Sequence, residues 1–555
     1  MIRRRLSAAR RRLAPERGFT MIVTIGILFI TGLLLVAAFT IAQGEVEASR
    51  NDVQDKQAYF AALSGVQEYE YQLQANPNYW QKCTGPSGTV PGESKEKYEV
   101  SVMPSTTAEE EKKTCSASAP FATAIESKGS LVNTFRIKSV GTAGKETRTL
   151  IATFKVKGFL DYIYFTNYET LDPELYAAGS ECKGQYRSEW IGKSYASKCV
   201  TIIFAGGDHI EGPMHTNDAS RVEGAAFGRK EHSPPDEVEI NGGTYPEDEN
   251  EKCTGSAKFY TETGCYTTKG ETLQIPESDT SLESYVESAN KWTGETIITL
   301  NGTTYNVKRW EKGVPEEKKG LAWPKNGLIF VTNNGTCSSP YEPHGADTGE
   351  EITNRENCGD VYVQGSYSES VTVAAEDNLV VTGNIYPTSV AGKLGSEPTG
   401  TPVAGLIASN FVRVYHPVFT TYSSASCKSG DKSLGGGKCE YKNSEGGCDA
   451  ENIEKASEDP NGWGSLHELY VYGAILSTAH SFIVDNWTCG EPLGKLHEYG
   501  AIAQNYRGTV GTTGGEGYLK DYKYDGRLAT DEPPYFLAPL KAGWKIIRET
   551  APKAG

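Results

Sequence analysis

One short segment holds the densest cluster of side chains that could do chemistry in this sequence. It contains His209, Glu211 and His215, whose side chains are of the types that zinc and related metals prefer as ligands. The pair Gly212-Pro213 predicts a turn, which would separate His215 from the other two side chains. A turn held by hydrogen bonds from side chains to the backbone is therefore the favoured interpretation, and we expect no cofactor.

The cysteines are the second set of residues that could do chemistry. The chain has 12 of them, all beyond residue 80, and none forms a CxxC pair of the kind found in zinc ribbons. An even number in this distribution indicates disulfides formed in an oxidising compartment, with buried free thiols as the alternative. We expect neighbours in the sequence to pair, two by two, in the order Cys83, Cys115, Cys182, Cys199, Cys253, Cys265, Cys337, Cys358, Cys427, Cys439, Cys448 and Cys489.

The motifs of common catalytic sites are missing from the sequence, which has no GxSxG, HExxH or Walker A segment. Paired carboxylates carry no information because the whole chain is acidic, with a formal net charge of −16. Residues 1–18 carry +6, so the remainder carries −22, which disfavours nucleic acid as the main partner. Aromatic runs such as 161–168 could stack on sugars, although such alternation is more typical of core strands. We expect no enzymatic activity.

An uncharged segment from Phe19 to Gln43 is the first element that must position the rest of the chain. As a helix, its 25 residues can span the hydrocarbon core of a bilayer. Seven arginines precede it and Glu45 and Glu47 follow it. The positive-inside rule therefore predicts a single-pass membrane protein with residue 1 in the cytoplasm and the bulk of the chain outside the cell.

The helical pattern continues past the apolar segment. Residues 45–75 lack proline, and Asn76-Pro77-Asn78 predicts the end of the helix. We therefore expect one long helix over about 19–75, with a plain signal anchor and a short stalk as the alternative. A seven-residue spacing of apolar side chains indicates a packing face for Val46, Val53 and Phe60, with Ala61, Val66 and Leu73 near the same face.

The residues Arg17-Gly18-Phe19-Thr20, placed before an apolar run, resemble the type III signal of type IV prepilins. This resemblance implies that a prepilin peptidase cuts between Gly18 and Phe19 and that the new N-terminal Phe19 is methylated. Main pilins carry a glutamate at the fifth mature position, which is Val23 here. The difference fits a minor, accessory or tip pilin better than a bulk subunit.

Residues 55–65 (DKQAYFAALSG) resemble the stretch that closes the N-terminal region of PilX-like pilus assembly proteins. Leu63 and Ser64 stand where that family has a glutamate and an alanine. Segments 212–218, 381–386 and 405–410 are similar to a β-rich extracellular domain found behind PilX-like N-termini. The resemblance implies that the partners are the prepilin peptidase, other pilins with their assembly machinery, and the lipid bilayer.

The remaining chain consists of short apolar runs that end at Gly or Asn, which predicts a mainly β fold. A small α+β pilin-like unit would precede a parallel β-helix (solenoid)-like ectodomain, and an antiparallel sandwich is the alternative. Three strands expected within 360–386 favour the solenoid. The expected divisions are a basic leader (1–18), a transmembrane helix (19–42), its amphipathic continuation (43–75), a small β-rich domain (76–157), the ectodomain (158–520) with Cys-rich insertions (245–290 and 421–465), and an extended tail (521–555).

Together these observations predict a non-enzymatic, surface-displayed accessory pilin-like protein that acts in pilus or pseudopilus assembly, adhesion or uptake. The alternative is a membrane-anchored β-helix protein that binds or degrades polysaccharide. A surface glycan is a possible partner under either interpretation.

Overall fold

The structure is a computed structural model. It describes residues 19–76, 78–93, 95–106, 114–119, 123–126, 134–156, 158–173, 180–245, 253–337, 356–421, 432–435, 438–440, 450–457, 459, 462–529, 531–540 and 543–551. The chain divides into two compact units. Unit 1 comprises Met1–Ala124, Phe135–Phe154 and Ile546–Gly555, and unit 2 comprises Ile125–Thr134 and Lys155–Lys545.

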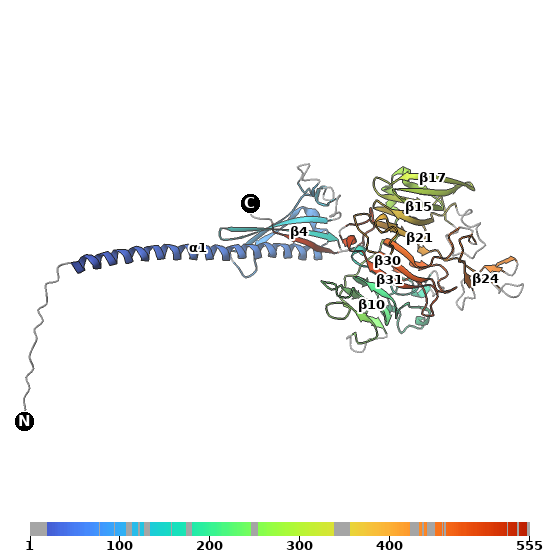
Figure 1. The fold of residues 1–555 in the computed structure, drawn as a ribbon, viewed down its shortest axis with the longest axis horizontal. Coiled ribbons are helices and arrows are strands. Elements are labelled where there is room, and N and C mark those ends of the chain that lie inside the picture. The colour runs from blue at the N-terminus through green and yellow to red at the C-terminus, as the bar shows by residue number, and fades with distance from the viewer. Residues whose placement is uncertain are drawn as a thin grey trace, which may run out of the picture. The chain divides into compact units, whose positions relative to one another are not determined.

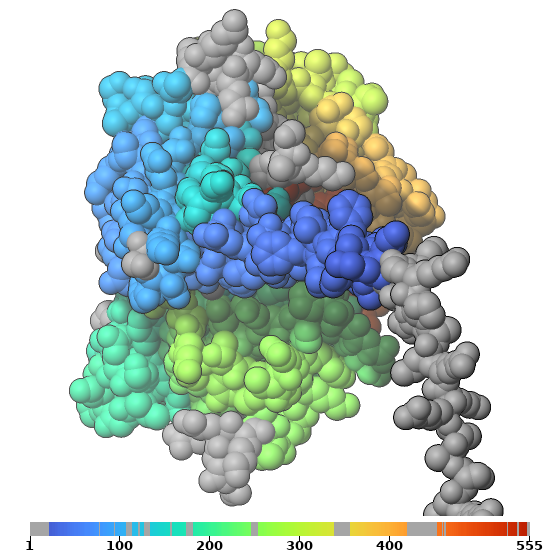
Figure 2. All heavy atoms as spheres, turned by 90° about the vertical axis from the view of Figure 1, so that its left-hand side faces the viewer, coloured from blue at the N-terminus to red at the C-terminus, as the bar shows by residue number. Residues whose placement is uncertain are grey.

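Unit 1 is built on one long helix. This helix, α1, spans Phe19–Ala75 and is 57 residues long, as predicted, which corresponds to about 85 Å at 1.5 Å per residue (Figure 1). It ends two residues before Pro77, where a proline would disturb the helical backbone. Its C-terminal half packs on an antiparallel sheet, and Figure 2 shows the blue helix atoms in contact with the lighter blue atoms of the first strands.

The sheet of unit 1 has five strands in the order β1-β2-β3-β4-β32. Residues 134–156 form a hairpin, and Gly144 in its turn takes a positive φ of 61° that suits glycine. Stacked rings fill the core, with the centroids of Phe135 and Phe154 5.2 Å apart. The strands are β1 (Thr84–Thr89), β2 (Lys97–Val102), β3 (Thr134–Ala143), β4 (Glu146–Val156) and β32 (Trp544–Thr550).

The last strand of the sheet comes from the far end of the chain. β32 lies beside β4, visible in Figure 1 as a red strand next to a cyan one. The main part of unit 2, Lys155–Lys545, is therefore inserted in the sequence between two neighbouring strands of unit 1. The segment 521–555, expected as an extended tail, is divided between the units, because its start belongs to β31 (Tyr518–Tyr524) of unit 2.

Unit 2 contains one large mixed sheet of 20 strands. The structure thus confirms a mainly β chain with a long apolar N-terminal helix. The strands not yet named are β5 (Tyr164–Tyr168), β7 (His209–Glu211), β8 (Met214–Thr216), β10 (Ala226–Phe227), β11 (Val238–Ile240), β13 (Lys258–Phe259), β14 (Lys291–Thr293), β15 (Thr296–Gly302), β16 (Thr304–Glu311), β17 (Val314–Ala322), β18 (Leu328–Thr332), β19 (Val361–Tyr367), β20 (Val371–Ala375), β21 (Leu379–Pro387), β22 (Ala404–Ala408), β23 (Val412–Val414), β28 (Leu469–Ser477), β29 (Phe482–Val484) and β30 (Gly494–Tyr506).

Most strands of this sheet pair in parallel with the strand after the next one. β18 pairs with β20 and β20 with β22, while β19 pairs with β21 and β21 with β23. Residues 360–386 form three strands as expected, of which β19 pairs in parallel with β21, whereas β20 pairs in parallel with β18 and β22. Among the described strands of the large sheet, the antiparallel pairs are β15 with β16 and β16 with β17.

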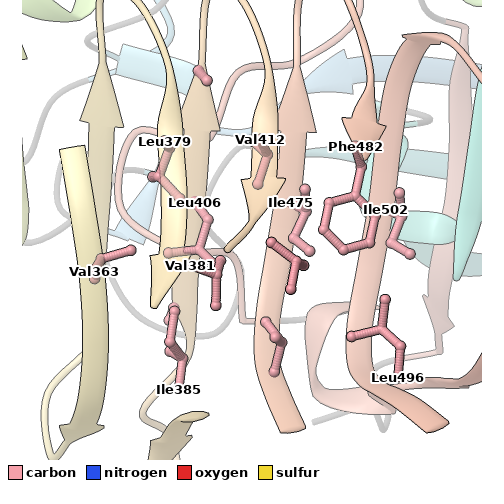
Figure 3. Close-up of a cluster of buried hydrophobic side chains, with 14 of the residues drawn as sticks. Val363, Leu379, Val381, Ile385, Leu406, Val412, Ile475, Phe482, Leu496 and Ile502 are labelled. Carbon is pink, nitrogen blue, oxygen red and sulfur yellow. The ribbon is translucent and has the colours of Figure 1, made fainter. Parts of the chain in front are cut away.

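The core of unit 2 is made of apolar side chains stacked in register. One row runs across four strands that pair one with the next, β19, β21, β23 and β29, and consists of Val361, Leu379, Val412 and Phe482. A second row joins Leu406 to Ile475 and continues through Ile502 of β30. Figure 3 shows members of both rows pointing into the same interior. Because paired strands lie about 4.8 Å apart, each row forms a continuous apolar ladder.

The strands nearest the start of unit 2 extend this sheet from its other end. β30 pairs in parallel with β28 and also with β5, and β5 pairs with β8. The strands β5, β7 and β8 therefore continue the large sheet beyond β30 and β31. Leu273, Ile275 and Leu282, within the expected insertion 245–290, pack into a second buried apolar cluster and so contribute to the core.

Two smaller sheets complete unit 2. One has the order β12-β9-β6 and consists of β6 (Ile203–Ala205), β9 (Ser220–Glu223) and β12 (Thr244–Tyr245). The other lies in the expected insertion 421–465, has the order β25-β26-β24-β27, and consists of β24 (Val418–Thr421), β25 (Lys432–Gly435), β26 (Lys438–Glu440) and β27 (Ala450–Asn452).

Candidate functional site

The N-terminal half of α1 is an exposed apolar rod. It is the described helix that is long and apolar enough to cross a membrane, with a mean hydropathy of 2.7 in its most apolar window and none of that window buried. Leu28 and Leu35 are about 70% exposed. Val23, at the position where the pilin resemblance leads one to look for a glutamate, is 42% exposed. Burying such a surface in lipid would remove a large apolar area from water.

The predicted processing site lies at the boundary of the described residues. Gly18 is outside them, and Phe19 is the first residue of α1. The proposed cleavage between these two residues would therefore leave a chain that begins with the helix itself.

The C-terminal half of α1 contacts the sheet through small residues. A Cβ added to Gly141 of β3 would lie 2.1 Å from the carbonyl oxygen of Ala58 and 2.2 Å from the backbone nitrogen of Ala62. Ser139 donates a hydrogen bond of 2.7 Å to the carbonyl oxygen of Ala62. Gly65 faces the same strand, with 2.4 Å between an added Cβ and the Ser139 hydroxyl. The small residues of the segment AALSG therefore allow helix and strand backbones to meet directly.

An ion pair fixes the helix further toward its middle. Both guanidinium nitrogens Nε and Nη2 of Arg148, on β4, donate to the carboxylate of Asp55, the second at 2.6 Å. The hydrogen bond from Arg148 holds the pKa of Asp55 below its usual value. Both side chains are partly exposed, 40% and 31%, so we expect the pair to orient the helix more than to stabilise it.

The predicted packing face divides into two faces in the structure. Ala61, Val66 and Leu73 are buried against the sheet, whereas Val46, Val53 and Phe60 are 69%, 51% and 61% exposed. The expectation of one shared face is wrong because 3.6 residues per turn place the two groups on different sides. Nine residues, or two and a half turns, separate Phe60 from the buried Tyr69, so these side chains point in opposite directions. We call Val46, Val53 and Phe60 the outer stripe.

The candidate metal ligands are not brought together by the structure. His209 and Glu211 point outward from β7 on either side of the buried Ile210, and Gly212-Pro213 turns the chain before β8. His215 is fully buried and uses both ring nitrogens. Its Nδ1 lies 2.6 Å from a carboxylate oxygen of Glu239, and its Nε2 lies 2.9 Å from the Asn217 side-chain oxygen.

His215 therefore belongs to a buried hydrogen-bond network. Tyr162 donates to the same Glu239 oxygen at 2.8 Å, and burial beside this carboxylate raises the pKa of the Tyr162 hydroxyl. Asn217 also donates to the carbonyl oxygen of Leu273 at 2.6 Å. The network links β8 and β11 to the segment around Leu273, so the role of His215 is structural.

One group of described residues comes close enough to hold a metal ion, and it consists of Cys337, Cys358 and Asp377. Its two sulfurs are joined as a disulfide, so they are not available as thiolate ligands. The sequence did not single out this group.

Four disulfides join neighbours in the sequence, as expected. They are Cys83–Cys115, Cys182–Cys199, Cys253–Cys265 and Cys337–Cys358. Cys489 is also disulfide-bonded. The side chains of Cys427, Cys439 and Cys448 lie outside the described part, so their pairing stays a prediction.

The aromatic run 161–168 forms the core strand β5 and the residues before it. Tyr162, Tyr164 and Phe165 are buried, and Tyr168 stacks on Tyr506 with 5.0 Å between the ring centroids. These rings are therefore not an exposed platform for sugars.

Sequence reasoning missed a cavity of about 820 Å³ in unit 2, lined by parts of three segments that are far apart in the sequence. Arg187, Asn241 and Tyr266 are among its lining residues. No local motif marks it, because each segment contributes only a few residues.

Comparisons with known proteins return little. No protein-family model and no curated protein matches the chain. Among solved structures, the chain is similar to the competence-associated pilin ComZ from Thermus thermophilus, with 10% identity over 90% of this chain and 98% of that chain. The TM-score is 0.24, a value at which the likeness carries no argument about fold or function.

Proposed function

We propose that this chain is a minor or accessory type IV pilin-like protein that is anchored by α1 and displays unit 2 outside the cell. The observation that carries the proposal is the division of α1 into two halves. One half is apolar and exposed, and the other is packed on an antiparallel sheet through Ala58, Ala62, Gly65 and Gly141. A signal anchor with a short stalk would not need this close packing.

The proposal assigns a partner to each part of the helix. The lipid bilayer takes the apolar half, and a prepilin peptidase takes the sequence around Gly18. The outer stripe faces away from the sheet and would pack on the helices of other pilins. Three apolar side chains at seven-residue spacing suit such a helix–helix contact. Val23 favours an accessory role because it offers no charge to a neighbour's N-terminal amine.

We propose further that unit 2 is a β-helix-like coil, used for assembly, adhesion or uptake and not for catalysis. Parallel pairing of each strand with the strand after the next supports this architecture, since a coil returns to the same face once per turn. The local disulfides support a location in an oxidising compartment.

The mature N-terminus tests the processing step. The full chain is expressed in cells with an active prepilin peptidase, and the purified protein is analysed by mass spectrometry. We expect a chain that begins at Phe19. The matched control is Gly18→Val, which should retain residues 1–18 in the same cells. Retention of residues 1–18 in the unsubstituted chain would remove the pilin assignment.

Photo-crosslinking tests the contact with other pilins. A benzophenone amino acid is placed at Val53, on the outer stripe, or at the exposed Asn51, two residues away and about 200° around the helix. We expect Val53 to give crosslinks to pilin helices in intact cells and Asn51 to give few. Equal yields at both positions would contradict a specific helix–helix face.

A further inference from the structure

The cavity of about 820 Å³ in unit 2 has three walls. The first is the short helix α4 (Arg187–Trp190) with Ile191, the second is the turn 241–243 with β12 and the neighbouring Ala219, and the third is the segment 265–268. The cavity is open to solvent on one side, and polar side chains dominate its named lining. It is thus accessible to a ligand from outside the protein.

Disulfides fix two of the three walls. Cys182–Cys199 closes the loop that contains α4, and Cys253–Cys265 ends directly before Tyr266, with Cys265 itself in the lining. The second wall is fixed by close packing, because a Cβ added to Gly242 would lie 2.4 Å from the backbone nitrogen of Ala219. Walls held in this way need little ordering when a ligand binds, which favours affinity.

Arg187 supplies a positive charge at the edge of the cavity. Its guanidinium lies over the ring of Tyr245, 3.5 Å from the centroid, and makes no hydrogen bond or ion pair with any residue that the structure describes. Its backbone N–H donates to Asp218 at 2.7 Å. The Asp218 carboxylate also accepts hydrogen bonds from the backbone N–H groups of Ala219 and Glu169, so both of its oxygens are already hydrogen-bonded to the backbone.

The remaining lining offers groups that suit hydroxyls. Hydroxyls of Ser188 and Thr268 line the same space. Ile191 is 50% exposed and provides an apolar patch against which the C–H face of a sugar ring could lie. Such a mixture matches a polyhydroxylated ligand better than an apolar peptide side chain.

We propose that this cavity binds an acidic saccharide, with the ligand carboxylate on Arg187 and its hydroxyls on the hydroxyl groups of Ser188 and Thr268. A single arginine suits the single charge of a carboxylate, which it can meet with two parallel hydrogen bonds. The net charge of −16 would repel polyanions such as nucleic acids. The inference does not depend on processing at Gly18 or on entry into a filament.

Binding of defined oligosaccharides tests the proposal. The full chain in detergent is applied to an array of uronate- and sialate-containing oligosaccharides and their neutral analogues, and hits are measured by calorimetry. We expect carboxylated members to bind and their neutral analogues to bind at least tenfold more weakly. Absence of binding to every carboxylated saccharide would overturn the proposal, as would preferential binding of inorganic phosphate or of a peptide C-terminus in the same assay.

Two variants and one control locate the site. Arg187→Gln should weaken binding about tenfold or more, and Ser188→Asp should do the same because it places a negative charge in the lining beside the ligand carboxylate. Arg221→Gln is the matched control, since Arg221 pairs with the exposed Glu223 and does not line the cavity. Unchanged affinity in both folded cavity variants would place binding elsewhere and overturn the assignment.

Discussion

Glu498 offers a quantitative test of the buried core of unit 2. Its side chain projects from β30, is fully buried, and has no hydrogen-bond partner for either carboxyl oxygen among the described residues. Burial, with a smaller effect of the nearby Asp525, raises the pKa of Glu498 well above 4.5. The folded protein therefore holds this group protonated under conditions in which the unfolded chain ionises it.

The sign of the effect on stability follows from this difference. Because the pKa is raised on folding, the contribution of Glu498 to stability is complete below about pH 4.5 and is lost as the pH rises toward the folded-state pKa. The loss amounts to at most about 1.4 kcal/mol per pH unit while the pH lies between the unfolded-state and the folded-state pKa. Glu498→Gln has nearly the same shape and no charge, so it removes this loss.

Chemical denaturation of unit 2 at pH 5, 6 and 7, with disulfides intact, measures the effect. We expect the free energy of unfolding of Glu498→Gln to exceed that of the unsubstituted chain by an amount that grows with pH, by up to about 1.4 kcal/mol per pH unit. The exposed Glu262→Gln serves as the control and should change stability little. A difference that stays constant from pH 5 to pH 7 would refute a protonated, buried Glu498.

Two further predictions concern packing and buried charge. Gly141→Val should lower the free energy of unfolding of unit 1 by about 1–3 kcal/mol in denaturation experiments, because the new side chain would overlap the backbone of α1. Gly44→Ala is the control and should not lower it, since Gly44 has open space around it. Equal stability of both variants would contradict the close packing. Lys520 and Asp208 form a buried ion pair with 2.7 Å between Nζ and the carboxylate. Lys520→Met should therefore lower the free energy of unfolding by roughly 3–5 kcal/mol, because it leaves the Asp208 charge buried and unpaired, and adding Asp208→Leu should recover part of that loss. A double variant less stable than Lys520→Met would contradict this explanation.

The sequence predicts those elements that depend on local patterns. An uncharged run followed by a proline-free stretch is enough to define α1 from Phe19 to Ala75, because helices form from contacts within a few residues. Alternation and a glycine turn likewise define the hairpin of β3 and β4. The local disulfides follow from short spacing, as Cys253–Cys265 shows.

Partners that lie far apart in the sequence could not be predicted in this way. β5 pairs with β30, with Phe165 opposite Ala503, although nothing in either segment specifies the other. The pairing of β32 with β4, which completes the sheet of unit 1, could not be predicted for the same reason: no local pattern in either strand indicates it. The cavity beside Arg187 depends on three such distant segments, so its residues are ordinary in sequence and become a site only after folding.

The insertion of unit 2 between β4 and β32 has a consequence for how the protein is made and lost. The ribosome makes β32 only after residues 157–543, so the edge of β4 stays open until those residues have emerged. A chain that stops before β32 keeps an unpaired strand edge that invites aggregation or removal. In the finished protein the backbone passes between the units at four places, after Ala124, before Phe135, after Phe154 and before Ile546. A protease that cuts any one of these crossings leaves the displayed unit joined to unit 1 by the others, and a pulling force on that unit is shared among them.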